Sequence, residues 1–139
     1  SCLGTDLGDL MLSSFQHHYS LNSFDQLVPV PLYKKQYRQR QYNQSEVLAR
    51  NLSRATGIPV EADTLARIRE TRPQFTLNKQ ERAQNIRNSF QVKNRAWLQG
   101  AKVLVIDDIC TTGSTINECA RVLKLSGAAE VHGLVLVHG

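Results

Sequence analysis

The sequence predicts an α/β fold with a mainly parallel, twisted sheet and helices on both of its faces. Apolar runs at 27–32, 103–106 and 130–137 have the length and the β-branched content of buried strands. Residues with helical spacing of apolar side chains stand between these runs, at 43–56 and 116–123. Strands that alternate with helices pair in parallel, and right-handed crossovers place the helices on both faces.

Length and composition indicate one domain, 1–139, with a core of its own. No apolar run is long enough to span a membrane and no signal peptide is visible, so we expect a cytoplasmic protein. The three cysteines form no Cys-x-x-Cys pair, which indicates reduced thiols and no zinc site in this chain. The net charge of +5 favours an anionic partner, either nucleic acid or a small polyphosphate.

The first element expected is a helix at about 5–18, with apolar residues on one face, and a turn follows at Asn22 and Ser23. The strand at 27–32 contains two prolines, which lack an amide donor, so the strand must end or turn there. The basic stretch that follows, up to residue 42, is either a solvated loop or a receiver for an anion.

Asn43 and Glu46 mark the start of a helix, and Gly57 and Pro59 mark its end. A strand is expected at 60–68, and regularity is lost at 69–75. The polar stretch 78–88 can form a helix, but it has little apolar surface to bury, so we expect it to be mobile without a ligand. Two interpretations of it stay open: a solvated surface helix, or a lid that carries Arg and Lys to an anion.

The stretch 103–115 carries the chemistry. A buried strand ends in Asp107 and Asp108, and a loop of small hydroxyl residues and one glycine leads into a helix that Gly127 closes. Such a loop lets main-chain amides approach a phosphate, and the start of the helix adds to the attraction. The two carboxylates can accept hydrogen bonds from vicinal hydroxyls or help to hold a divalent cation. A phosphate beside a diol describes a ribose 5-phosphate, bound outside the carboxyl end of the strand.

Three alternative roles fit residues 103–115 less well. A response-regulator receiver domain needs several more βα units after the acidic strand, and residues 116–139 provide one helix and one strand. A nucleotide hydrolase needs a G-x-x-x-x-G-K-[ST] loop, which the sequence lacks. Carboxylates that merely cap a helix would be costly to bury without a cation or a hydroxyl partner.

Residues 103–115 resemble, at every position, the 5-phosphoribosyl 1-pyrophosphate (PRPP) fingerprint of type I phosphoribosyltransferases. The resemblance is closest to the competence-protein ComF branch, which is similar to the glutamine amidophosphoribosyltransferases. Three further motifs are similar to that branch: Val-Pro-Val-Pro-Leu at 28–32, Arg-Gln-Tyr-Asn-Gln at 40–44, where Gln41 replaces the usual glycine, and the flexible-loop pattern at 67–85. The zinc-binding Cys-x-x-Cys module that often begins this family is absent, so either this member lacks it or the chain is truncated.

The resemblance implies a type I phosphoribosyltransferase fold with a small hood, for which 1–24 and the flexible loop 69–90 are available. It implies that Asp107 and Asp108 bind the ribose hydroxyls, directly or around Mg²⁺ that is held mainly through the ligand. The residues that would hold the 5-phosphate are Thr111, Thr112, Gly113, Ser114 and Thr115. The residues that would take the pyrophosphate are the turn of Val30, Pro31, Leu32 and Tyr33, together with Arg69, Lys79 and Arg82.

Two functions are therefore expected of such a chain. The first is Mg²⁺-dependent transfer of a 5-phosphoribosyl group from PRPP, or from another phosphorylated ribose, to an acceptor that the sequence does not identify. The alternative is a PRPP-binding competence or regulatory protein without turnover, which acts through single-stranded DNA or a DNA-uptake helicase. The resemblance also makes a homodimer an expected form.

Overall fold

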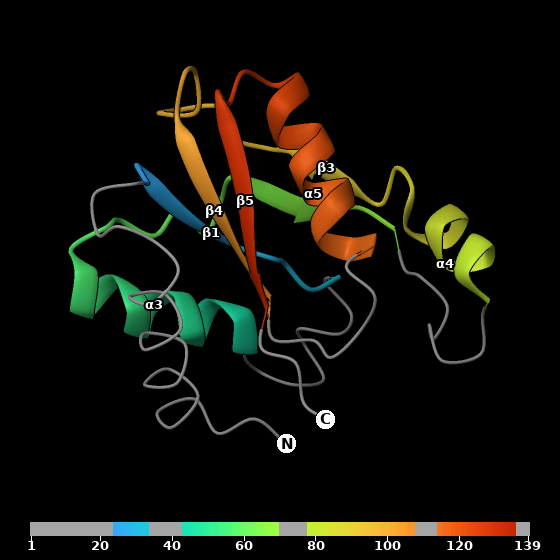
Figure 1. The fold of residues 1–139 in the computed structure, drawn as a ribbon, viewed down its shortest axis with the longest axis horizontal. Coiled ribbons are helices and arrows are strands. Elements are labelled where there is room, and N and C mark those ends of the chain that lie inside the picture. Colours follow the sequence, from blue (N-terminus) through green and yellow to red (C-terminus); the bar gives the residue numbers. More distant parts are fainter. Residues whose placement is uncertain (1–23, 34–42, 70–77, 108–113, 136–139) are drawn as a thin grey trace.

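The computed structural model of the chain describes residues 24–33, 43–69, 78–107 and 114–135 (Figure 1). The helix expected at 5–18, the basic stretch 34–42 and most of the small-residue loop lie outside these residues. The described elements are β1 (Gln26–Pro29), α3 (Gln44–Thr56), β2 (Leu65–Arg67), α4 (Lys79–Ile86), β3 (Phe90–Val92), β4 (Lys102–Asp107), α5 (Ser114–Leu125) and β5 (Glu130–Val135). None of the helices in these ranges is long and apolar enough to cross a membrane.

The predicted parallel sheet is confirmed, with strand order β1-β4-β5. β4 lies in the centre and pairs in parallel with both neighbours, so that Leu27 lies beside Leu104 and Ile106 beside Leu134. All four residues from Val103 to Ile106 are fully buried, as expected for a strand covered on both faces. β4 is thus held on both edges and both faces, and Asp107 is its last residue.

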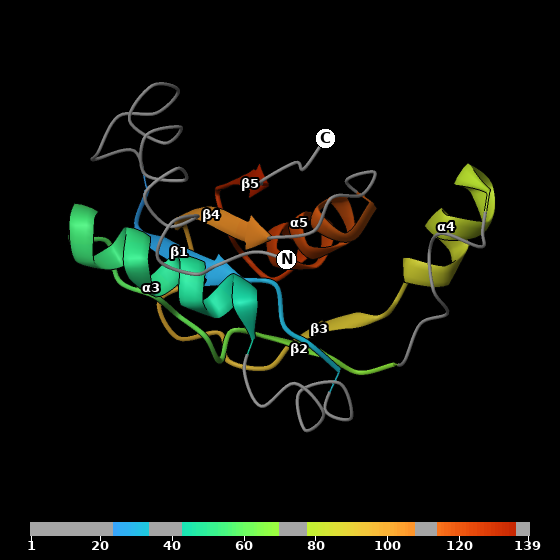
Figure 2. The same ribbon diagram turned by 90° about the horizontal axis from the view of Figure 1, so that it is seen from below.

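The two faces of the sheet are covered by different helices, as the sequence predicts (Figures 1 and 2). Because side chains alternate along a strand, Leu104 and Ile106 pack in one cluster with Leu48 and Leu52 of α3. Val103 and Val105 point to the other face and belong to a cluster that includes Cys119 and Leu123 of α5. The expectation that Cys119 is a core residue is confirmed, since its side chain is fully buried.

A second sheet, which the sequence pattern did not predict, consists of β2 and β3 in antiparallel pairing (Figure 2). The strand expected at 60–68 is shorter, Leu65–Arg67, and Val60 makes only an isolated bridge to Leu27. β3 was missed because three residues give no measurable periodicity. Leu65 and Phe90 anchor this ribbon in the α5-side cluster, and the segment 69–90 leaves from β2 and returns at β3.

The predicted ends of α3 are confirmed. The Asn43 side chain accepts a hydrogen bond from the Ser45 N–H at 3.1 Å, and Gly57 has φ +79°, a conformation that favours glycine. The other end of the Asn43 amide donates to the Val30 carbonyl at 3.0 Å. The start of α3 is therefore tied to the chain that follows β1.

Candidate functional site

Asp107 ends the central strand and is only 3% exposed. Asp108, Thr111, Thr112 and Gly113 lie outside the described residues, and the chain resumes at Ser114, the first residue of α5. Thr115, in the first turn of α5, is 2% exposed. The predicted order of strand, acid and helix is thus confirmed for the residues described, and the N-terminal amides of α5 follow the acidic end of β4 closely in the chain.

The turn after β1 lies beside this end of β4. The Val30 N–H donates to the Ile106 carbonyl at 2.9 Å, which extends the parallel ladder one residue beyond β1. The Val30 side chain is 3% exposed and packs in the core beneath the turn. The Val30 N–H is already hydrogen-bonded to β4, and Pro31 has no backbone N–H. A main-chain amide that binds an anion at this turn must therefore come from a later residue, such as Leu32. Pro31, Leu32 and Tyr33 are all half-buried.

Arg67 is a cation that interacts electrostatically with Asp107. Its guanidinium lies 5.0 Å from the ring centroid of Phe90, and its backbone makes an isolated bridge to Tyr33. Burial lowers the pKa of Arg67, while negative charge at Cys119 and Asp107 acts in the opposite direction. Burial, followed by the charge of Asp107, raises the pKa of Cys119, so the thiol stays protonated at neutral pH and, of these two groups, Asp107 is the anion that acts on Arg67.

A cleft of about 560 Å³ opens beside the turn and has the size of a small-ligand site. Arg67 and Lys93 supply cations to its wall, and Glu46 and Asp63 supply carboxylates. The remaining described residues of its lining are Pro31, Leu32, Asn43, Ala62, Leu65 and Ala66. Since Arg67 both lines this cleft and interacts electrostatically with Asp107, it connects the cleft to the acidic end of β4.

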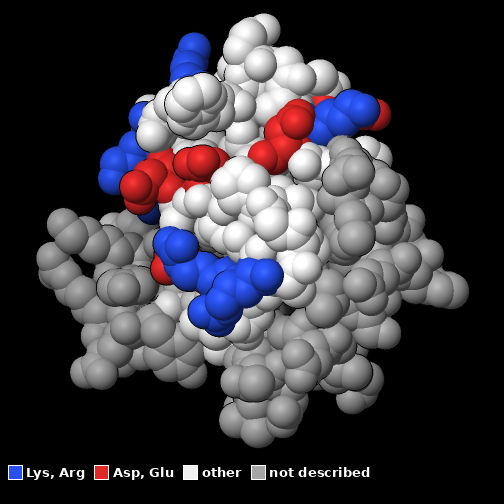
Figure 3. Space-filling view, turned by 90° about the vertical axis from the view of Figure 1, so that its left-hand side faces the viewer, with Lys and Arg blue, Asp and Glu red and all other residues white. Residues whose placement is uncertain are grey.

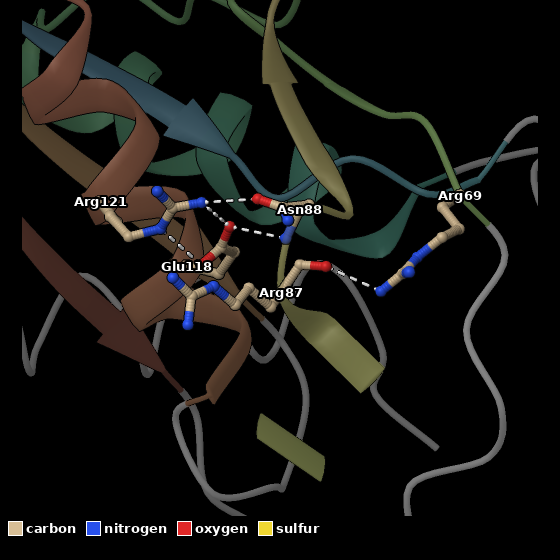
Figure 4. A network of polar contacts seen from close by, with 5 residues as sticks. All are labelled: Arg69, Arg87, Asn88, Glu118 and Arg121. Carbon is tan, nitrogen blue, oxygen red and sulfur yellow. Dashed lines mark hydrogen bonds and ion pairs between the residues drawn. The ribbon is translucent and has the colours of Figure 1, made fainter. Parts of the chain in front are cut away.

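The chain after α4 is fastened to α5 by a group of side chains, shown in Figure 4, that we call the Glu118 network. Its members are Asn88, Glu118 and Arg121. The Glu118 carboxylate, in a residue only 8% exposed, accepts from the Asn88 N–H at 3.0 Å and from Arg121 Nε at 2.9 Å. Arg121 Nη2 also donates to the Asn88 side-chain oxygen at 3.2 Å. Asn88 has φ +61°, a conformation that asparagine tolerates better than most residues.

Electrostatics favour the ionised form of this carboxylate. The hydrogen bond from Arg121 lowers the pKa of Glu118, and the Asn88 N–H acts in the same direction, while burial acts against both. The network therefore joins the returning end of the 69–90 segment to the helix that follows the β4 loop. Any movement of that segment must preserve or break these contacts.

Of the three basic residues predicted to bind pyrophosphate, the structure describes the side chain of Arg69 but not those of Lys79 and Arg82. Arg69 is exposed, and its Nη2 donates to the Arg87 carbonyl at 2.7 Å, which joins the two ends of the 69–90 segment (Figure 4). Lys79 and Arg82 belong to α4, and their side chains lie outside the described part of the chain. α4 lies at one end of the molecule, away from β1, in both ribbon views (Figures 1 and 2). The helix predicted at 78–88 is confirmed, and its mobility and lid role stay predictions.

Sequence reasoning missed four residues near the candidate site. Arg67 lies in a stretch that resembles the flexible-loop pattern, but nothing in the sequence shows that it approaches Asp107. Glu118 is an acid next to the apolar positions of its helix, which is a weak signal of a buried carboxylate. Asn88 and Arg121 gave no signal, because their contacts depend on how β3 and α5 pack.

The model of the family described as "Phosphoribosyl transferase domain" matches residues 43–139. The chain is 36% identical over 107 residues to the DNA utilization protein YhgH of Salmonella typhi, which covers 77% of this chain and 46% of that protein. It is 35% identical over 106 residues to Competence protein F of Haemophilus influenzae, covering 76% of this chain and 46% of the relative. It is 32% identical over 114 residues to Competence protein ComFC of Bacillus subtilis, with 80% and 43% covered. The chain thus spans about half the length of the curated relatives it matches.

Solved structures with a similar fold include one described as the allosteric regulatory enzyme of purine biosynthesis, with 25% identity and a TM-score of 0.62. That match covers 95% of this chain and 25% of the other. The glutamine PRPP amidotransferase of B. subtilis matches at 24% identity, TM-score 0.59, with the same coverage. A purine phosphoribosyltransferase from Pyrococcus horikoshii matches at 16% identity, TM-score 0.53, covering 96% of this chain and 71% of that one. The last two likenesses concern the fold alone.

Proposed function

The chain belongs to the phosphoribosyl transferase domain family and has the predicted type I phosphoribosyltransferase fold, and from this premise we propose that it binds PRPP and transfers its phosphoribosyl group to an acceptor. The observation that carries the proposal is the 2.9 Å hydrogen bond from the Val30 N–H to the Ile106 carbonyl. It joins the proline-rich turn to the acid-ended strand, the two motifs to which the proposal assigns the pyrophosphate and the ribose. A sugar that carries a phosphate and a pyrophosphate needs both.

The proposed roles follow from position. Asp107 and Asp108 accept hydrogen bonds from the ribose hydroxyls, and the loop 111–115 with the N-terminus of α5 binds the 5-phosphate. Pyrophosphate leaves the anomeric carbon as the acceptor attacks, and charge develops on the leaving oxygens and on the ring. Fixed groups aimed at that charge, with correct placement of the reactants, supply the catalysis. No covalent nucleophile from the protein is needed.

Mg²⁺ fits this site as a partner of the substrate. Carboxylate, hydroxyl and phosphate oxygens suit the ion, and when bound it would neutralise charge on the leaving pyrophosphate. Arg67, which interacts electrostatically with Asp107, disfavours a second cation in direct contact with that carboxylate. We therefore assign the ion mainly to the oxygens of the ligand, with Asp107 and Asp108 nearby.

The test is thermal unfolding with PRPP and MgCl₂. A ligand at about 100 times its Kd stabilises the folded state by roughly 2.7 kcal/mol, which corresponds to a rise in Tm of about 5–10 °C for a domain of this size. Asp108→Asn should abolish the rise, whereas Glu130→Gln, which changes an exposed carboxylate at the start of β5, on the edge of the sheet opposite to Asp107, should retain it. An unchanged Tm of the unsubstituted protein at millimolar PRPP would contradict the proposal.

A second candidate function is PRPP binding without turnover in competence or DNA utilization. It is supported by the names of the relatives, which are a DNA utilization protein and competence proteins. The distinguishing measurement is pyrophosphate release: a Tm rise without release, over a panel of amine and nucleobase acceptors, favours this candidate. Salt-dependent binding of single-stranded DNA would extend it to nucleic acid, and a pull-down of a DNA-uptake helicase would identify a protein partner. A cytoplasmic location and a homodimer remain predictions.

A further inference from the structure

A cavity of about 350 Å³ lies at the edge of the sheet where β1 begins. Its described lining residues are Asp25, Gln26, Pro59, Glu61 and Trp97, and we call it the Trp97 cavity. β1 and β4 are parallel, and Gln26 pairs with Val103, so this edge is opposite to the one that carries Asp107. At about 3.3 Å per residue the two edges are roughly 13 Å apart along β4. The Trp97 cavity is therefore separate from the proposed PRPP site.

Gln26 brings a buried, unsatisfied acceptor to this cavity. The residue is 2% exposed, and its Nε2 donates to the Trp97 carbonyl at 2.9 Å. Because a carbonyl can only accept, this contact determines which end of the amide is the nitrogen. The other end, Oε1, is buried and has no hydrogen-bond partner among the described residues. A buried acceptor in this state is costly to the folded protein, and Gln26 is thus a strained part of the cavity wall.

The other lining groups favour a cation. The Trp97 side chain is 81% exposed, and the face of an indole attracts positive charge. Asp25 and Glu61 add two carboxylates, and no Lys or Arg is among the described residues that line the cavity. The local charge is thus opposite in sign to the net charge of +5 of the chain. Figure 3 views the side of the molecule at which β1 begins, where acidic side chains lie beside uncharged surface and Lys and Arg side chains lie close to them.

We propose that the Trp97 cavity docks an arginine side chain of a partner protein. A planar guanidinium can stack on the indole while its N–H groups donate to the carboxylates of Asp25 and Glu61. Trp97 is an exposed aromatic residue beside a pocket, the arrangement that commonly anchors a protein interface.

The chain contains one tryptophan, so its fluorescence reports on this cavity alone. The full chain is titrated with the capped tripeptide acetyl-Gly-Arg-Gly-amide and, as a neutral isostere, with the same peptide carrying citrulline. The arginine peptide should give a saturable change in Trp97 fluorescence, with a Kd on the order of millimolar for so small a ligand. The citrulline peptide should give no saturation, and a lysine peptide should bind more weakly than arginine. Equal responses to the arginine and citrulline peptides, or no saturation with either, would overturn the proposal and leave a cavity that holds water only.

Two variants test whether the arginine peptide binds at the Trp97 cavity. Glu61→Gln should weaken the arginine peptide about two- to fivefold, the range expected for one partly exposed charge pair. Asp63→Asn is the matched control, because Asp63 lines the other cleft, and it should bind the peptide as the unsubstituted protein does. Unchanged affinity in Glu61→Gln would contradict the charge argument. Glu61→Gln should keep the Tm rise with PRPP, so the outcome here is independent of the proposed function.

Discussion

Replacing Glu118 with alanine should destabilise the protein and release the chain after α4 from α5. The hydrogen bond from the Asn88 N–H ends on a carboxylate in a residue 8% exposed, and such a bond to a charged group contributes about 1.5–3 kcal/mol. The Arg121 side chain is 39% exposed, so its ion pair adds only about 0.2–1 kcal/mol. The expected loss in the free energy of unfolding is therefore roughly 2–4 kcal/mol, measured by urea denaturation at pH 7.

The pH dependence gives a second measurement on the same network. Because contacts with Arg121 and Asn88 lower the pKa of Glu118 from its ordinary 4.5, the stabilisation is fully present above that value and is lost as the pH falls through the lowered pKa. Glu118→Gln has no group that titrates at this position. The difference in the free energy of unfolding between the unsubstituted protein and this variant should therefore become smaller as the pH falls below about 4.5.

The matched control is Glu46→Ala. Glu46 pairs with Arg50 one turn away at 3.4 Å on the exposed face of α3, and such a pair contributes about 0.3–0.5 kcal/mol. Hydrogen exchange localises the effect, because the Asn88 amide should exchange faster in Glu118→Ala and keep its rate in the control. If Glu118→Ala and Glu46→Ala lose the same stability, or if the Asn88 amide keeps its protection in both, the Glu118 network does not hold this segment.

Three further substitutions test the fold and the site. Leu104→Ala should destabilise the protein by about 2–5 kcal/mol in urea denaturation, since Leu104 is fully buried in the central strand. Asn43→Ala should lower stability by about 0.5–2 kcal/mol through loss of the α3 cap, and should also weaken PRPP binding in the Tm assay because Asn43 holds the Val30 carbonyl. Arg67→Met should reduce the Tm rise with PRPP while leaving far-ultraviolet circular dichroism unchanged; a full rise would exclude a role for Arg67 near Asp107.

Local features could be predicted from the sequence because neighbouring residues determine them. The acid-ended strand, the existence of a helix over 116–123, and the Asn43 and Gly57 ends of α3 all follow from short-range steric and hydrogen-bonding rules, whereas the start of that helix at Ser114 was not predicted. The parallel pairing could also be predicted from the sequence, because a strand, a helix and a strand in succession form a parallel pair that is joined by a right-handed crossover. The candidate phosphate loop could be recognised from residue order alone.

The tertiary structure decided which distant residues meet. β3 is too short to show a pattern, yet its pairing with β2 sets the base of the 69–90 segment. Register in the parallel sheet places Val30 against Ile106, and packing of α5 brings Glu118 to Asn88. Gln26 and Trp97 meet across 71 residues of sequence. Such contacts depend on the summed packing of several elements, and a single sequence records the periodicity of each element but not the positions at which they touch.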